Sequence, residues 1–285
     1  MSADREIFEH VNEAKANFDD VYNAPDPRGY YRALGALDYR IPTEAKPVFR
    51  RVMRAMGRDR LRVVDIGCSY GVNAAILRYN LTFADLVERY QGQSMDARSV
   101  AEVVCEDAHE FAEMPEAIDA SFVGLDVARE AAGYARAVGL IDEAIVENLE
   151  AHPMSDAAKA AVEGADLIIT TGAVGYVTQR TFSRLLDAVG RRPPWVATFS
   201  LRQFPFDGIA DEIETFDLRT ERLENRHFAQ RAFKDEDERE GAIEAVRAAG
   251  CDPDGLETTG SYFADFHLSR PRSECRTKLA DMGLV

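Results

Sequence analysis

The sequence has no long apolar run, few cysteines and a shortage of positive charge, and each shortage excludes a class of protein. No apolar stretch reaches the roughly 20 residues that a membrane-spanning helix needs, and the first residues lack the basic and then apolar pattern of a secretory signal. The cysteines lie too far apart for a metal-binding Cys-x-x-Cys pair, and nothing in the sequence suggests an oxidising compartment that would join them as disulfides; they are Cys68, Cys105, Cys251 and Cys275. We therefore expect a cytoplasmic protein with reduced, structural thiols.

The charge balance is acidic. Lys and Arg number 34 against 50 Asp and Glu, a formal net charge of −16. A polyanion is repelled overall, so nucleic acid is not an expected partner, despite a local group of arginines between residues 50 and 62. With 285 residues, 46% of them hydrophobic, the chain can bury a substantial core. We expect one domain over residues 1–285.

Short apolar runs alternate with helical segments in the middle of the chain. Strands are expected at 61–66, 122–126, 144–148, 167–170 and 195–200, and helices at 72–79, 128–138, 155–162 and 181–189. Strands that alternate with helices of about ten residues predict a parallel sheet covered on both faces. Residues 56–200 would form this core, and the polar stretch 81–117 would add one or two helices as an insertion.

The two ends of the chain differ from this core. Residues 1–55 predict a helical cap, with an acidic helix over 5–20, an aromatic loop around Pro25 and Pro27, and a second helix after Pro42. In the last part, 201–285, we expect irregular structure over 202–217 and then strands over 226–233 and 261–269 around a charged helix over 235–249. These late strands suggest an antiparallel edge on the substrate side of the sheet.

A glycine turn, Gly67-Cys68-Ser69-Tyr70-Gly71, joins the first strand to a helix. Glycines allow a close approach of a ligand, and the helix N-terminus offers unpaired N–H groups. The spacing departs from the G-x-G-x-x-G fingerprint, so a NAD site fits poorly. As G-x-S-x-G, the turn also matches the nucleophile elbow of serine hydrolases, with Ser69 as nucleophile, His267 as base and Asp126 or Asp166 as the third member. That alternative stays open here.

The residues before the turn add a second resemblance. Val63-Val64-Asp65-Ile66-Gly67-x-Ser69-x-Gly71 resembles the first motif of the class I S-adenosylmethionine-dependent methyltransferases, which is apolar-apolar-acid-x-Gly-x-Gly-x-Gly. Serine replaces the middle glycine and still permits a close approach. The resemblance implies that Asp65 orients the amino group of S-adenosylmethionine. It also places the turn under the methionine part, which gives cofactor-binding roles to Gly67, Cys68, Ser69 and Gly71.

The family's second motif has a counterpart at the end of the next expected strand. Asp126, followed by Val127 and a helix, resembles the acid that accepts both ribose hydroxyls. A carboxylate suits a diol because it accepts two hydrogen bonds at once. Asp126 could instead be an ordinary helix N-cap, a role that Asp often fills.

Two more motifs follow in the family's order. Asn148 with Leu149 resembles the motif beside the adenine, although Asn148 could merely end a strand. The strand end at Thr170, Thr171 and Gly172 resembles the one that faces the transferable methyl. The resemblance covers about residues 55–200. It implies a Rossmann-like three-layer α/β sandwich whose mostly parallel sheet has a reversed C-terminal strand.

Tyrosines crowd before the first strand. Four of the ten in the chain are Tyr22, Tyr30, Tyr31 and Tyr39. They could pack the cap onto the core, or their rings could hold a sulfonium by cation–π contact. We take Tyr22, Tyr30 and Tyr31, together with Tyr176 after the fourth strand, as candidate catalytic residues. His109 lies among acidic residues but is typical of a solvated helix face, so no metal is expected.

The resemblance implies an S-adenosylmethionine-dependent methyltransferase that releases S-adenosylhomocysteine. Its catalysis would be mostly alignment and desolvation. The aromatic cap and the acidic charge favour a small-molecule acceptor, bound between the cap and residues 202–233; no membrane partner is expected, and a homodimer is left open. An enzyme of this fold could instead cyclise the cofactor to azetidine-2-carboxylate and release methylthioadenosine. The serine hydrolase is the second alternative.

Overall fold

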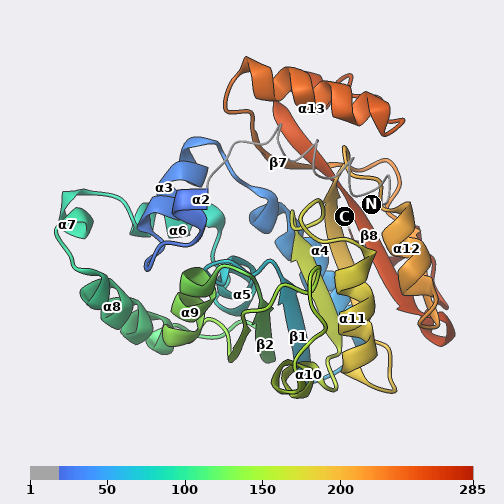
Figure 1. Cartoon of the computed structure of the whole chain (residues 1–285), viewed down its shortest axis with the longest axis horizontal. Coiled ribbons are helices and arrows are strands. Elements are labelled where there is room, and N and C mark those ends of the chain that lie inside the picture. The colour runs from blue at the N-terminus through green and yellow to red at the C-terminus, as the bar shows by residue number, and fades with distance from the viewer. Residues whose placement is uncertain (1–18, 285) are drawn as a thin grey trace.

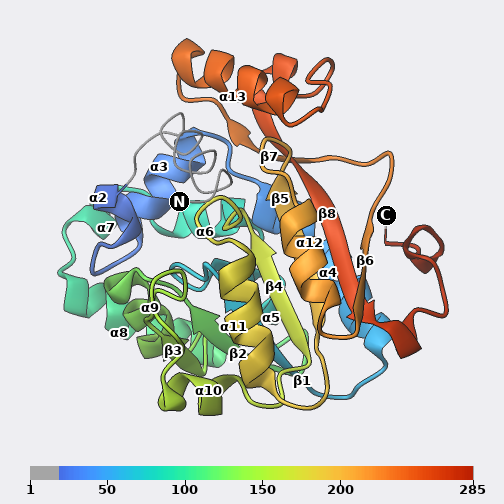
Figure 2. The same ribbon diagram turned by 45° about the vertical axis from the view of Figure 1, so that its right-hand side comes forward.

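The strands of the protein build a single mixed sheet. The structure is a computed structural model that describes residues 19–284, so most of the helix expected over 5–20 lies outside the described residues. Within that part, the strand order is β3-β2-β1-β4-β5-β8-β6, and β7 pairs with β8 off this path (Figure 1 and Figure 2).

Five neighbouring strands are parallel, as predicted. They are β1 (Leu61–Ile66), β2 (Ala120–Leu125), β3 (Glu143–Ile145), β4 (Leu167–Thr171) and β5 (Trp195–Leu201). Each is short and apolar, and its carboxyl end lies at the same edge of the sheet as the carboxyl ends of its neighbours. This edge carries the residues that the motifs single out.

The last strand, β8 (Ser261–Pro271), runs antiparallel to β5, which confirms the expected reversed C-terminal strand. Its other side carries two shorter strands. β6 (Leu218–Arg222) pairs with residues 267–271, and β7 (Phe228–Ala232) pairs with residues 261–264. Figure 2 shows β6 beyond β8 on the side away from β5.

Helices cover both faces of the sheet. On one face lie α4 (Ile41–Met56), α5 (Val72–Arg78) and α9 (Arg129–Ala137); on the other lie α10 (Asp156–Val162), α11 (Gln179–Val189) and α12 (Asp207–Glu214). Successive strand residues point to opposite faces, so Val63 packs in the first layer and Val64 in the second. The predicted three-layer sandwich is confirmed.

The cap and the insertion pack together into a third apolar cluster. It joins α3 (Arg28–Ala36), α6 (Phe83–Arg89), α7 (Gln93–Asp96) and α8 (Val100–Glu113), beside the short α2 (Asp19–Tyr22). The insertion thus holds three helices instead of one or two. The expected aromatic loop is largely α3, because Pro27 lies just before a helix, where its fixed φ is favourable. The helix α4, expected in the cap, belongs to the sheet layer.

One prediction for the C-terminal third is wrong, and one strand there was not predicted. Residues 207–214 are not irregular but form α12, which buries Ile209 and Ile213 one helical turn apart. The strand β6 was missed because it is charged and borders only β8. The remaining elements are α13 (Glu236–Ala248), η1 (Glu257–Thr259), η2 (Arg272–Glu274) and η3 (Leu279–Met282).

Candidate functional site

The backbone of the glycine turn is left-handed at three positions. Its φ is +72° at Gly67, +49° at Ser69 and +76° at Gly71. A Cβ on Gly67 would lie 2.8 Å from the Cβ of Ala173, so a side chain there would collide with the turn after β4. Ser69 adopts the left-handed conformation that the family's middle glycine would take. The turn therefore keeps the backbone shape of the motif despite the serine.

Asp65 is a buried carboxyl group with half of its hydrogen-bonding capacity unused. It is 0% exposed near the end of β1, and its Oδ1 accepts a hydrogen bond from Asn73 Nδ2 at 2.9 Å. Across residues 19–284, its Oδ2 finds no hydrogen-bond partner. Burial raises the pKa of Asp65 to about 7, although the bond from Asn73 lowers it. An amine or cation beside Oδ2 would remove the cost of this buried charge.

Asp126 follows β2 and ties two loops together. Its Oδ2 accepts from the backbone N–H of Ser69 at 2.8 Å, and its Oδ1 accepts from Ala128 N–H at 2.9 Å. Burial raises the pKa of this carboxyl, while these backbone bonds lower it. The N-cap of α9 is Ala128, so the alternative that Asp126 is the helix N-cap is wrong. Each carboxylate oxygen keeps a second lone pair for a ligand.

Asn148 lies farther from the sheet than predicted. The third strand ends at Ile145, and Asn148 is exposed in the turn that follows. Its Oδ1 accepts from the backbone N–H of Glu150 at 3.0 Å and of Ala151 at 3.1 Å. It does not end a strand but stabilises a turn, and the neighbouring Leu149 is buried.

The end of β4 connects to Asp65 through Asn73. The Asn73 amide donates to Thr171 Oγ1 at 3.1 Å as well as to Asp65. Gly172 has a φ of +81°, and a Cβ there would lie 2.6 Å from Gln230 Nε2. Neither Asn73 nor Gln230 was predicted, because only the fold brings them to this edge. Thr170 is fully buried beneath the same turn.

The cap is attached directly to the glycine turn. The Tyr70 hydroxyl accepts from Ala24 N–H at 2.9 Å and donates to the carbonyl of Val21 at 3.0 Å. Asn23 Oδ1 accepts from the N–H of Glu130 in α9. These contacts hold residues 21–24 over the loops that follow β1 and β2. Tyr70, which sequence reasoning also overlooked, lies inside the motif itself.

The candidate tyrosines fall into two groups. Tyr30 is buried with its ring 5.1 Å from that of Tyr70, and Tyr22 packs edge-on against it at 5.3 Å. Burial raises the pKa of Tyr22, and Tyr176 raises it further, which brings Tyr22 and Tyr176 to the same region. Tyr31 instead stacks on Tyr90 at 4.8 Å in the cap interior, where packing explains its contacts.

Tyr39 joins the first group. Burial raises its pKa, with smaller contributions from Tyr22 and Asp65. Its ring packs on that of Phe83 at 5.0 Å.

Three large apolar side chains stay exposed among the described residues, and all three adjoin this edge. They are Tyr22 at 38%, Tyr176 at 63% and Val127 at 64% exposure. Val127 follows Asp126, and Tyr176 follows the turn after β4. Exposed apolar groups that gather beside unsatisfied polar atoms are typical of a ligand site.

The geometry contradicts a serine hydrolase. The Ser69 hydroxyl is buried and makes no hydrogen bond within the described part of the chain. His267 lies on β8, stacked on Phe206 at 4.1 Å, and burial lowers its pKa to about 3. Asp166 accepts from the N–H of Arg62 at 2.8 Å instead of from a histidine. The proposed triad members therefore do not meet.

The structure also bears on membrane-spanning helices, metal sites and the state of the cysteines. Between residues 19 and 284, no helix combines the length and apolar character needed to cross a membrane. The same residues hold no group of three or more His, Cys, Asp or Glu side chains arranged to bind a metal, and His109 is exposed. All four cysteines are free thiols.

No protein-family model and no curated protein sequence matches the chain. Solved structures resemble it at low identity. The plantazolicin methyltransferase BamL, in complex with a triazolic desmethylPZN analogue and SAH, is 12% identical, with 94% of this chain and 98% of that chain covered and a TM-score of 0.47. A TehB-like SAM-dependent methyltransferase from Corynebacterium glutamicum is 13% identical, with coverage of 77% and 86% and a TM-score of 0.37. The [4+2]-cyclase SpnF is 12% identical, with 79% of each chain covered and a TM-score of 0.39.

The sheet and the motifs agree with the expectation from the sequence. The glycine turn follows β1, an acid follows β2, and the parallel strands end in a reversed strand, β8. The chain has the Rossmann-like fold of the class I S-adenosylmethionine-dependent methyltransferases.

Proposed function

We propose that the chain binds S-adenosylmethionine at the carboxyl ends of β1, β2 and β4 and transfers its methyl group to a small-molecule acceptor. The observation that carries the proposal is the unpartnered Oδ2 of Asp65, a buried carboxylate oxygen beside a left-handed glycine turn. An ammonium group is the partner that such an atom lacks. The amino group of S-adenosylmethionine supplies one.

The other residues fit the same ligand. Asp126 is oriented by two backbone N–H groups and can still accept from a ribose diol. Gly67 and Gly71 carry no side chains, which lets a ligand approach the backbone of the turn. Val127 and Tyr176 offer exposed apolar surface to a flat base. When bound, the cofactor supplies a methyl group already activated on a sulfonium.

The protein's own contribution is alignment and the exclusion of water. The cap is held above the site by contacts of Tyr70 and Asn23. Tyr22 packs on Tyr30, whose ring packs in turn on Tyr70 of the glycine turn, so the ring of Tyr22 can reach a sulfonium by cation–π contact. A prearranged enclosure of this kind raises the rate by holding the reactants in line.

A small acceptor is favoured over nucleic acid. The arginines between residues 50 and 62 are largely used within the chain: Arg50 binds the carbonyl of Leu77, Arg58 binds Asp166, and Arg60 pairs with Asp119. The net charge of −16 opposes a polyanion. The free thiols are compatible with a reducing, cytoplasmic setting.

Calorimetry with S-adenosylmethionine tests the proposal. The wild-type protein should bind it, and Asp65→Asn should bind it at least tenfold more weakly; equal affinities would contradict the assignment. Incubation with the cofactor alone then separates the two reactions. Accumulation of methylthioadenosine without an acceptor would support the cyclase, whereas S-adenosylhomocysteine formed only with an added acceptor supports methyl transfer.

A further inference from the structure

A second polar region borders the turn after β4, and none of the motifs accounts for it. Gln203 follows β5 and is only 2% exposed, yet neither its Oε1 nor its Nε2 has a hydrogen-bond partner anywhere in residues 19–284. Gln230 on β7 is more than nine-tenths buried, and its amide lies against Gly172. Gln230 therefore lies against the start of the turn after β4, while Gln203 is enclosed in the loop that follows β5.

The turn over residues 172–175 places these glutamines relative to the cofactor region. Gly172 N–H donates to the carbonyl of Phe199 in β5. Phe204, adjacent to Gln203, fills the space above Gly175, where a Cβ would lie 2.5 Å from its ring. β4 lies between β1 and β5 in the sheet, so Gln203 is on the opposite side of β4 from the glycine turn. This is the side left for a second substrate.

The charged groups nearby are already neutralised. Arg231 makes a two-pronged contact with Glu238, at 2.9 and 2.6 Å, and Arg202 donates to Glu257 at 2.5 Å. A substrate anion would have to compete with these buried carboxylates. A carboxamide, in contrast, offers both a donor and an acceptor and carries no charge.

We propose that Gln203 and Gln230 bind the second substrate through an uncharged group that both donates and accepts hydrogen bonds, such as a carboxamide or lactam. The proposal rests on the proposed methyl transfer and deepens it, because it names the chemical class of the acceptor. It also gives the buried amide of Gln203 a role, because the bound acceptor would supply its hydrogen bonds. Without ligand, that amide destabilises the fold.

The test compares Gln203→Met and Gln230→Met with Gln91→Met, a control at an exposed glutamine after α6. Three probes of one ring size differ in charge: benzamide, benzoate and benzylamine. Their dissociation constants are measured by ligand-observed NMR on protein saturated with S-adenosylhomocysteine. Thermal denaturation without ligand and calorimetry with S-adenosylmethionine complete the set.

We expect benzamide to bind the wild-type protein more tightly than the two charged probes. Each site variant should weaken benzamide at least threefold and keep the S-adenosylmethionine affinity within twofold, because a site built to pair a polar group discriminates against a mismatch. Gln203→Met should also raise the melting midpoint by about 2 °C or more, since it removes an unpaired buried amide. The control should change none of these values.

Several results would overturn the proposal. They are benzamide affinity that is undetectable in the wild-type protein, matched by benzoate or benzylamine, or unchanged in both site variants. A higher midpoint in Gln203→Met with unchanged benzamide affinity would mean that the amide holds a water molecule only. Failure of the wild-type protein to bind S-adenosylmethionine would refute the proposed function instead, and the benzamide series on the ligand-free protein would still decide the amide site.

Discussion

Two buried aspartates in this protein have opposite surroundings. Asp107, on α8, accepts from Arg89 Nε at 2.8 Å and Nη2 at 2.6 Å and from the hydroxyls of Tyr90 and Tyr134 at 3.0 and 2.5 Å. Asp65 accepts one hydrogen bond, from Asn73. A carboxylate whose lone pairs all accept hydrogen bonds stabilises the fold. A carboxylate oxygen that has no hydrogen-bond partner among the described residues can still bind a ligand.

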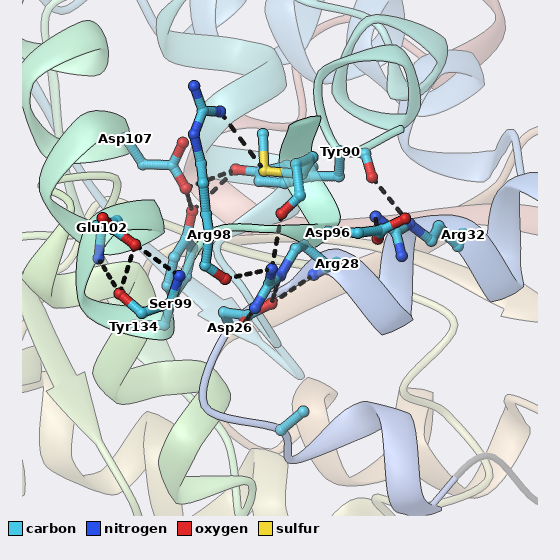
Figure 3. A network of polar contacts seen from close by, with 12 residues as sticks. Asp26, Arg28, Arg32, Tyr90, Asp96, Arg98, Ser99, Glu102, Asp107 and Tyr134 are labelled. Carbon is cyan, nitrogen blue, oxygen red and sulfur yellow. Dashed lines mark hydrogen bonds and ion pairs between the residues drawn. The ribbon is translucent and has the colours of Figure 1, made fainter. Parts of the chain in front are cut away.

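The surroundings of Asp107 show what the cap and insertion contribute. Figure 3 shows Asp107 between Tyr90 of the insertion and Tyr134 of α9, beside a second set of contacts from α3. There, Arg28 donates to the carbonyls of Met95 and Arg98 at 2.8 and 2.9 Å. The insertion is thereby joined to the helix after Asp126 and to the cap, and these contacts hold the three segments together above the site.

The largest effect should come from breaking the satisfied carboxylate. Asp107→Ala leaves Arg89 buried without its main partner and should lower the free energy of unfolding by about 3–5 kcal/mol. Urea denaturation measures this loss. Asp156→Ala, which removes a fully exposed partner of Lys159, should leave the midpoint unchanged. If the two variants unfold alike, the contrast between structural and ligand-binding aspartates is wrong.

Removing the carboxylate of Asp65, whose Oδ2 has no hydrogen-bond partner among the described residues, should raise stability instead of lowering it. The pKa of Asp65 rises from 3.8 to about 7 on folding, so the folded chain holds an extra proton between about pH 4 and 7, and stability falls as pH rises through this window. Asp65→Asn escapes this loss. At pH 8 it should be more stable than wild type by on the order of 3 kcal/mol, with no advantage near pH 4.

Denaturation at both pH values checks this prediction. The same variant should lose affinity for S-adenosylmethionine, which separates stability from function. A loss of stability at pH 8 would show that the wild-type carboxylate has a partner that stabilises it.

We expect an effect of intermediate size from the loss of the Asp126 carboxylate. Asp126→Ala removes an acceptor for the ribose hydroxyls and should weaken S-adenosylmethionine binding by about 1.5–3 kcal/mol in calorimetry. Asn148→Ala serves as the comparison, because its carbonyl oxygen is occupied by the turn amides of Glu150 and Ala151. Unchanged affinity in Asp126→Ala would count against the ribose assignment.

The tyrosines give a smaller, two-sided prediction. Tyr22→Leu should weaken S-adenosylmethionine binding severalfold and change stability by less than about 0.5 kcal/mol, because Tyr22 is partly exposed at the site. Tyr31→Leu should do the reverse and lower stability by about 1–3 kcal/mol, since its ring stacks on Tyr90. If both variants lose binding affinity and stability in parallel, the tyrosines contribute only packing.

Ser69→Ala should have the smallest effect. The hydroxyl is buried and unpaired within the described residues, so its removal should change stability by less than about 1 kcal/mol. Binding of S-adenosylmethionine should persist, because the backbone makes the approach. Labelling of Ser69 by a fluorophosphonate would instead support the serine hydrolase alternative.

The edge of the sheet where we propose that the cofactor binds was predictable, because the residues that mark it lie close together in the sequence. Asp65 and the glycine turn lie within seven residues of each other, and left-handed positions leave a glycine-rich trace in the sequence. The parallel strands were predictable for a related reason, since strands buried on both faces form continuous apolar runs. Boundaries were less secure, as Asn148 shows by lying beyond the end of β3.

The residues of the proposed acceptor site could not be predicted from the sequence alone. Gln203 and Gln230 carry no motif, and β7 meets the turn after β4 only through its pairing with β8. Asn73 is a helix residue like any other until the fold brings Thr171 within hydrogen-bonding distance. The helix α3 was obscured by two prolines, although one of them marks its start.

The divided outer edge of β8 limits how freely the C-terminal third can be changed. β6 occupies one half of that edge and β7 the other, so the chain between residues 223 and 260 leaves and rejoins the sheet beside a single strand. The pairing of the five parallel strands does not involve this segment. The cap does depend on it, because Arg40 N–H donates to the carbonyl of Gln230 and Ala232 N–H donates to the carbonyl of Leu37. Changes in residues 223–260 therefore act on the cap through β7 and leave the pairing of the parallel strands unaltered.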